Sequence, residues 1–310
     1  MSTFQLLLTF ARTTYETAYL KLYHPLAFYT ALLNNQPMGF YAPCVIVEDA
    51  KRHSITVLPV DINKSYAKCT IENGALRLGF QYVDGIGEAT LKTLEREREK
   101  GPYSSLREFC KRTRLATPAI ENLIMVGAFD SLGIPRRDLL WQLGEIKKSH
   151  GSKQMALSLT VPGEAVSFKD LTPWEKTGLD YMVLGLTTGP HITTYYREMW
   201  QKLSVVASKD LDLFEDGQKV RVAGLVIVRQ QPSTAKGHIF ISLEDEFGYI
   251  NVIVRPQVVK RFHKIVRREP FPLIEGRIIV DGKVKNVLAE RFLNGVPTLQ
   301  LAQSVSCDFR

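Results

Sequence analysis

Residues 218–292 decide how the C-terminal third of this chain folds, from QKVRVAGLVIVRQQP (218–232) to GKVKNVLAERF (282–292). Apolar and polar residues alternate with a period of two, which is typical of strands that bury one face. Turn residues interrupt the alternation, and one amphipathic stretch at 259–268 separates its two halves. This order predicts a small five-stranded barrel over residues 211–310 with one short helix between strands.

The outward positions of the predicted barrel carry polar and aromatic side chains. Barrels of the oligonucleotide-binding type (OB-folds) bind on the face of the second and third strands, helped by the first and last loops. Aromatic platforms in a positive groove suit single strands. We therefore predict nucleic-acid contacts from Arg221, Arg229, Lys236, His238, Phe240, Tyr249, Asn251 and Lys283. The alternative for Phe240 is that it covers a neighbouring domain.

A second pattern, Val83-Asp84-Gly85-Ile86-Gly87, lies between two predicted helices and indicates a helix-hairpin-helix turn. Gly85 and Gly87 permit the tight turn, and Ile86 would anchor it in the core. Its N–H groups and the following helix N-terminus can hold a phosphate oxygen, with Lys92 one turn further on. Such contacts hold the DNA backbone without reading sequence. The alternative is an ordinary turn between helices.

A second copy of the hairpin is predicted around Gly127, in LIMVGAF (123–129). Helix-hairpin-helix motifs often occur as a pseudo-symmetric pair, which strengthens the interpretation of the first copy. This copy lacks the second glycine, so we expect it to pack more than it binds.

Composition favours a polyanionic partner. The 310 residues carry a formal net charge of +8 and a pI near 9.2, and no apolar run is long enough to span a membrane. The four cysteines are scattered, without metal or disulfide spacing, so no metal site is predicted. The N-terminus lacks a basic region typical of a signal peptide, which favours a cytoplasmic protein.

The rest of the chain completes an α+β multidomain prediction. Residues 1–74 form an α/β region, in which Pro25 should divide a helix over 15–34. Residues 75–148 form the helix-hairpin-helix domain, and residues 149–210 a linker with helices. The barrel follows at 211–310.

These pieces together resemble the C-terminal part of the C-family bacterial DNA polymerase III alpha subunit, in its error-prone branch. The resemblance covers nearly the whole chain from about Thr9. It rests on long motifs such as HPLAF (24–28), LLNNQPMGFY (32–41), GAFDSLG (127–133), VKRFHKIVRREPF (259–271) and NVLAE (286–290).

The resemblance implies that residues 1–74 are the end of a fingers domain. The phosphoesterase-like domain, the palm and most of the fingers of such a polymerase lie upstream of the matched region. We therefore expect no catalytic residue, metal or cofactor in this chain, because Mg²⁺ and nucleotides belong to the palm carboxylates. The chain alone is expected not to polymerise.

The resemblance also implies partners. Similar alpha subunits bind the sliding clamp through a short motif in the linker, where this chain has Gln154, Leu157 and Leu159. The expected function is DNA binding at the nucleoid within damage-induced, translesion synthesis, together with the clamp and other accessory proteins. Alternatives are an active polymerase subunit completed by another chain, or a barrel module that binds single-stranded nucleic acid, RNA or tRNA on its own.

Overall fold

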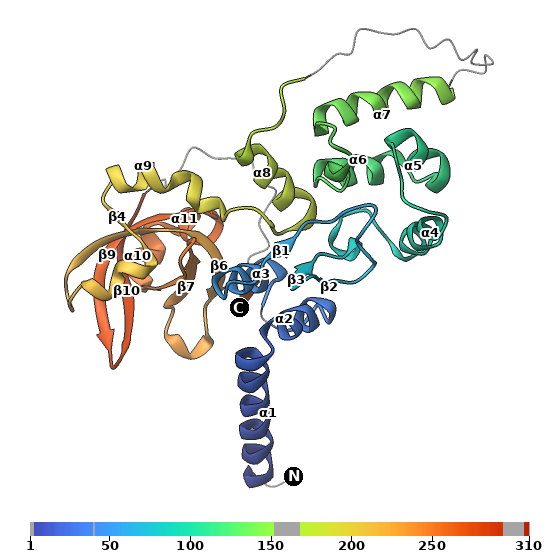
Figure 1. Ribbon diagram of the computed structural model, residues 1–310. Coiled ribbons are helices and arrows are strands. Elements are labelled where there is room, and N and C mark those ends of the chain that lie inside the picture. Colours follow the sequence, from blue (N-terminus) through green and yellow to red (C-terminus); the bar gives the residue numbers. More distant parts are fainter. Residues whose placement is uncertain (1–2, 40, 152–167, 294–306, 310) are drawn as a thin grey trace. The chain divides into compact units, whose positions relative to one another are not determined.

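The computed structural model describes residues 3–39, 41–151, 168–293 and 307–309 (Figure 1). The chain forms two compact units. The first contains residues 1–36 and 53–188, and the second contains residues 37–52 and 189–310. The segment 37–52 thus belongs with the C-terminal sheet, whereas the sequence-based division kept it within 1–74.

The first unit begins with two helices, α1 (Thr3–Tyr23) and α2 (Pro25–Asn34). They are divided at Pro25, as predicted, because proline lacks the N–H that a continuing helix needs. Helix α2 buries Tyr29 and Leu33. A small sheet follows, with strands in the order β1 (Val57–Leu58), β3 (Ala75–Arg77), β2 (Thr70–Glu72).

The remainder of the first unit is helical. Three aromatic rings, Tyr103, Phe109 and Phe129, meet edge to face in its core. The elements are η1 (Phe80–Tyr82), α4 (Glu88–Arg98), α5 (Leu106–Thr113), α6 (Thr117–Met125), η2 (Asp130–Leu132), α7 (Arg136–Gly151) and α8 (Pro173–Leu184). No helix in the parts of the chain that the structure describes is long and apolar enough to cross a membrane.

The second unit combines short helices with a large sheet. Helical elements are α3 (Pro43–Arg52), η3 (Ile192–Tyr196), α9 (Arg197–Lys202), η4 (Ser208–Leu213), η5 (Ser233–Ala235), α10 (Pro256–Arg261) and α11 (His263–Arg268). Among the described residues the sheet has eight strands, in the order β11-β6-β7-β8-β10-β9-β5-β4. They are β4 (Val205–Val206), β5 (Lys219–Ala223), β6 (Leu225–Gln230), β7 (Ile239–Glu244), β8 (Tyr249–Val254), β9 (Leu273–Asp281), β10 (Val284–Leu293) and β11 (Cys307–Phe309).

Gly224 joins two strands that lie near opposite ends of the sheet order. Only this residue separates β5 from β6, yet β5 pairs with β9 and β6 pairs with β7. The chain therefore turns the corner from one side of the sheet to the other. The alternation predicted this interior: the inward side chains are buried, among them Val220, Val222, Ile239, Ile241, Leu243, Ile250, Val252 and Val254.

The helical stretch between β8 and β9 is divided at Phe262 into α10 and α11. Val259 and Val266 are buried in the sheet's core and Phe262 packs against it, so the predicted apolar stripe is confirmed. The basic side chains of this stretch lie on its other face.

Gly276 in β9 has no room for a side chain, because a Cβ there would overlap the carbonyl oxygen of Leu288 and lie 2.9 Å from Val287 Cγ1. We expect Gly276→Ala to lower the free energy of unfolding by about 1–3 kcal/mol. Gly248→Ala is the matched control, since its Cβ would come only within 3.4 Å of Ser208 Oγ. Urea unfolding, followed by tryptophan fluorescence, measures both variants, since one of the three tryptophans, Trp200, is buried in the same unit as Gly276 and Gly248. Equal stability of the two variants would contradict the packing argument.

Candidate nucleic-acid interface

The first hairpin turn has the geometry that its glycines allow. Gly85 has φ +76°, a conformation that other residues rarely adopt. Ile86 is buried, and its N–H donates to the carbonyl of Val83 at 3.2 Å. The turn therefore presents backbone at the surface while one apolar side chain fixes it in the core.

The start of α4 is the most open part of this turn. Gly87 precedes the helix with φ −86°, and a Cβ added there would meet no atom within 4 Å. The first N–H groups of a helix have no partner within the helix, and they attract anions. The N–H of Gly85 is less available, because it donates to the carboxylate of Asp84 at 2.9 Å. Gly87 and the first residues of α4 are thus the groups that can hold a phosphate.

The turn is held from two sides by residues that sequence reasoning missed. Asn122 Nδ2, from α6, donates to the carbonyl of Asp84 at 2.9 Å. The N–H of Asp84 donates to the carbonyl of Val183, in α8, at 3.0 Å. These bonds hold the turn in place before any ligand arrives.

The second hairpin turn is covered. Gly127 has φ +77°, and a Cβ there would overlap the guanidinium of Arg136. Arg136 is buried, pairs with Asp130 at 2.8 Å, and donates to the carbonyl of Met125 at 2.7 Å. Gly127 therefore lies beneath a side chain, in contrast to the open Gly87.

The cations of α4 differ in how far their side chains are engaged in contacts within the protein. Lys92 is mostly exposed and pairs with Glu88 at 2.7 Å, a surface ion pair that contributes little stability. Arg98 instead lies 3.9 Å from the centroid of the Tyr66 ring and donates to the carbonyl of Ser65. Lys92 can turn to a phosphate at small cost, whereas Arg98 is part of the fold.

In the second unit, three of the predicted residues share the outer face of β7 and β8. The register pairs Phe240 with Ile253, Ser242 with Asn251, and Glu244 with Tyr249. Phe240 is 37% exposed and Tyr249 42% exposed. The two rings lie at opposite ends of this face, with Asn251 between them.

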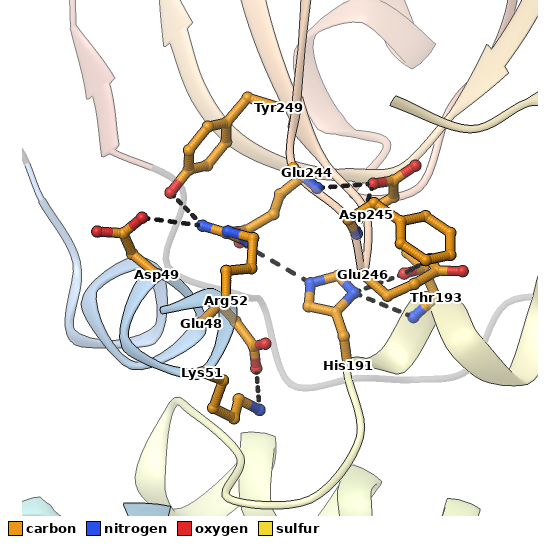
Figure 2. Close-up of polar contacts among 12 residues, drawn as sticks. Glu48, Asp49, Lys51, Arg52, His191, Thr193, Glu244, Asp245, Glu246 and Tyr249 are labelled. Carbon is orange, nitrogen blue, oxygen red and sulfur yellow. Dashed lines mark hydrogen bonds and ion pairs between the residues drawn. The ribbon is translucent and has the colours of Figure 1, made fainter. Parts of the chain in front are cut away.

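Arg52 of α3 closes the Tyr249 end of the face (Figure 2). Its guanidinium donates to the Tyr249 hydroxyl at 2.5 Å and to Glu244 Oε1 at 2.8 Å, and lies 4.6 Å from the ring centroid. Burial raises the pKa of the Tyr249 hydroxyl. Tyr249 therefore anchors α3, and the open part of the face runs from Asn251 to Phe240.

The turn from β7 to β8 holds three consecutive carboxylates. Glu244 and Asp245 are fully buried. Asp245 accepts hydrogen bonds from the N–H and hydroxyl of Ser208, at 2.8 and 2.5 Å. Glu246 accepts from Arg197 Nε at 2.6 Å and from the Thr193 hydroxyl at 2.7 Å. Burial would raise the Glu246 pKa, but these hydrogen bonds outweigh it and lower the pKa below its ordinary value.

His191 and Glu48 make the least satisfied part of this cluster. His191 Nδ1 lies 2.6 Å from Thr193 Oγ1, but its Nε2 is 3.8 Å from Glu244 Oε2, beyond hydrogen-bond distance. Burial raises the pKa of Glu48, although His191 and Lys51 oppose the shift. No group of His, Cys, Asp and Glu among the described residues has the arrangement of a metal site.

The remaining predicted residues have different surroundings. Arg229 is half-buried and donates to the carbonyls of Val266 and Glu269, at the C-terminal end of α11. Arg221 pairs with Glu275 at 2.9 Å, and His238 Nδ1 lies 2.8 Å from the carbonyl of Ala235. Lys236 and Lys283 are exposed in the β6–β7 and β9–β10 loops.

The predicted clamp-binding residues Gln154, Leu157 and Leu159 lie outside the described residues.

The comparisons with known proteins agree with this geometry. Residues 54–139 match a family described as "Helix-hairpin-helix motif", so the first unit contains a motif of that class. Nearly the whole chain is similar to proteins named error-prone DNA polymerase. The identity is 36% over 97% of the chain in Anaeromyxobacter dehalogenans, 37% over 90% in Rhodopirellula baltica, and 33% over 97% in Pseudomonas aeruginosa.

The chain spans only about a quarter of the length of these relatives, at 27%, 24% and 30%. Among solved structures, asparaginyl-tRNA synthetase from Pyrococcus horikoshii aligns with a TM-score of 0.23 and 26% identity, over 29% of this chain and 21% of that one. That likeness is too low to bear on fold or function.

Arg52→Met would leave the buried Glu244 without its cation. Because an unpaired buried charge is costly, we expect a loss of about 3–5 kcal/mol in the free energy of unfolding. Adding Glu244→Gln to this variant should restore part of the lost free energy of unfolding. A double-mutant cycle in urea unfolding measures the effect. Arg277→Met, which breaks an ion pair with Glu290 that is nearly half exposed, is the control and should cost less than about 1 kcal/mol. Equal losses from Arg52→Met and Arg277→Met would refute a special role for the buried pair.

Glu48→Gln should stabilise the protein at neutral pH. A carboxyl group whose pKa is raised in the folded state binds its proton more tightly there, so its contribution to stability is lost as the pH rises through the folded pKa. Glutamine stays neutral and avoids that loss. The gain should shrink as the pH falls toward about 4, near the unfolded pKa of a glutamate. Urea unfolding across this pH range tests the prediction, with the exposed Glu198→Gln as control. A gain that does not change with pH would contradict it.

Proposed function

We propose that this chain is the DNA-binding C-terminal part of an error-prone DNA polymerase alpha subunit. The observation that carries the proposal is the open turn at Gly87, with the first N–H groups of α4 and the exposed cation of Lys92 one turn further on. A helix N-terminus of this kind binds one phosphate without reading bases. The names of the similar proteins supply the context in which such binding is needed.

We further propose that the second unit is an OB-fold that binds the single-stranded template. Its strand order supports this: one strand bends through Gly224, β8 pairs in parallel with β10, and β9 returns to β5. A helical stretch lies between the third and fourth strands of this barrel. Binding would use Phe240 as a stacking platform, Asn251 beside it, and Lys236 and Lys283 in the flanking loops.

In this proposal the two units divide the DNA between them. The hairpin holds the duplex behind the growing end, and the barrel holds the unpaired template. Nucleotide addition, with its Mg²⁺, belongs to palm carboxylates of the polymerase outside this chain. The segment around Gln154, Leu157 and Leu159 would bind the sliding clamp, so the assembly stays on damaged DNA during translesion synthesis.

The division of labour predicts a reciprocal pattern in two variants. Gly87→Ala fits the φ of −86° and meets no neighbouring atom, so the fold should persist while the new methyl group obstructs a phosphate. We expect it to weaken primer-template duplex binding about 5–10-fold. Phe240→Ala should instead weaken single-strand binding by the value of one stacked base, about 1–3 kcal/mol.

Fluorescence anisotropy of labelled single-stranded DNA and of primer-template DNA, over a salt series, measures both affinities. Gly144→Ala, in open surroundings on α7, is the matched control for Gly87→Ala. A chain that binds only single strands, with Gly87→Ala silent, would favour the independent barrel module over the polymerase assignment. Absence of binding to either DNA at low salt would refute both.

A further inference from the structure

A basic groove on the first unit takes no part in the interface described above. It has a volume of about 720 Å³ and lies between α5, α6 and α7. Four aliphatic side chains, Leu115, Ile120, Leu143 and Ile146, form its apolar lining. Four cations, Arg107, Lys111, Arg114 and Lys147, line it as well, and all four are exposed.

These cations have no acidic partner among the described residues. Elsewhere in the unit cations are mostly paired: Arg112 with Glu108 at 3.0 Å, Lys100 with Glu97 at 2.8 Å, and Arg136 with Asp130 at 2.8 Å. The contrast is sharpest at a neighbouring hollow, which shares Lys111 and Arg114 but is also lined by Glu97 and Glu108. The basic groove has no carboxylate in its lining.

The arrangement is electrostatically unfavourable without a ligand. Arg107, Lys111 and Arg114 follow one another at i, i+4 and i+7, so they lie on one side of α5 and its C-terminal end. Like charges at this spacing repel each other, and an anion in the groove would relieve the repulsion. The groove therefore has an electrostatic preference for an acidic occupant.

We propose that this groove binds an acidic amphipathic helix of a partner protein. The apolar side of such a helix would cover Ile120, Leu143 and Ile146, and its carboxylates would pair with the four cations. A single nucleic-acid strand fits less well, because the lining has no aromatic ring on which its bases could stack, and a duplex backbone would leave the four aliphatic side chains uncovered. The chain's own residues 152–167 do not supply the charge either, since they carry one carboxylate, Glu164, and one lysine, Lys153.

The probe for the test is a fluorescein-labelled helical peptide of about 18 residues, with leucines on one face and glutamates on the other. Anisotropy with the full chain should show saturable binding. A peptide of the same composition in scrambled order, with no apolar face, should bind at least tenfold more weakly. The double variant Lys111→Glu/Lys147→Glu should lower affinity for the amphipathic peptide at least tenfold and leave duplex DNA binding within twofold of the wild type.

Lys92→Glu is the matched control, because it makes the same kind of charge reversal outside the groove, and it should leave peptide binding unchanged. Ile146→Ser tests the apolar lining without changing charge, and should weaken the peptide severalfold. Circular dichroism establishes that each variant is folded.

Three outcomes would overturn the proposal: no peptide binding by the wild type, equal loss in Lys111→Glu/Lys147→Glu and Lys92→Glu, or displacement of the peptide by single-stranded DNA of equal charge. The last would assign the groove to nucleic acid. Because peptide and DNA are measured separately, failure of this proposal is distinguishable from failure of the DNA-binding function.

Discussion

The second unit depends on three consecutive carboxylates at the turn from β7 to β8, of which Glu244 and Asp245 are buried and Glu246 is half-buried. Buried charge is tolerated only when cations or N–H donors surround it. Those donors come from separate stretches of the chain: Arg52 in α3, Ser208 at the start of η4, and Arg197 at the start of α9. This one turn therefore connects three helical elements of the unit, α3, η4 and α9, to the sheet.

The same requirement limits the surface that can bind a ligand. Tyr249 has the position of a stacking residue. However, Arg52 donates a hydrogen bond to its hydroxyl and lies over its ring, so α3 covers that end of the strand face. Phe240, at the other end, has no such neighbour among its strand-register partners. The guanidinium of Arg229 is likewise engaged within the protein, because it donates hydrogen bonds to carbonyl groups at the end of α11. The second unit thus keeps a short open face.

Local patterns in the sequence predicted much of this architecture, but they did not predict the contacts between residues far apart in the chain. Alternation placed Val222, Ile241 and Val252 inside the sheet, because a strand with one buried face has a period of two. Glycine spacing located the turn at Gly85, since a positive φ favours glycine. No periodic signal predicts the hydrogen bond from Arg52 to Glu244 or the one from Asn122 to the carbonyl of Asp84, because these bonds join residues far apart in the chain. Two of the predicted DNA contacts, Tyr249 and Arg229, have intramolecular partners of this long-range kind.

The place of α3 has a consequence for how the protein can be dissected. The chain begins in the first unit, enters the second unit at residue 37, leaves it after Arg52 to complete the first unit over residues 53–188, and returns at residue 189. The two units therefore alternate along the chain, and residues 53–188 interrupt the second one. During synthesis α3 leaves the ribosome long before strands β7 and β8, against which it packs. Arg52 and its partner Glu244 are 192 residues apart in the sequence. An expression boundary at residue 189 would therefore yield the large sheet with Glu244 deprived of Arg52, whereas joining residues 37–52 to it would supply the missing helix.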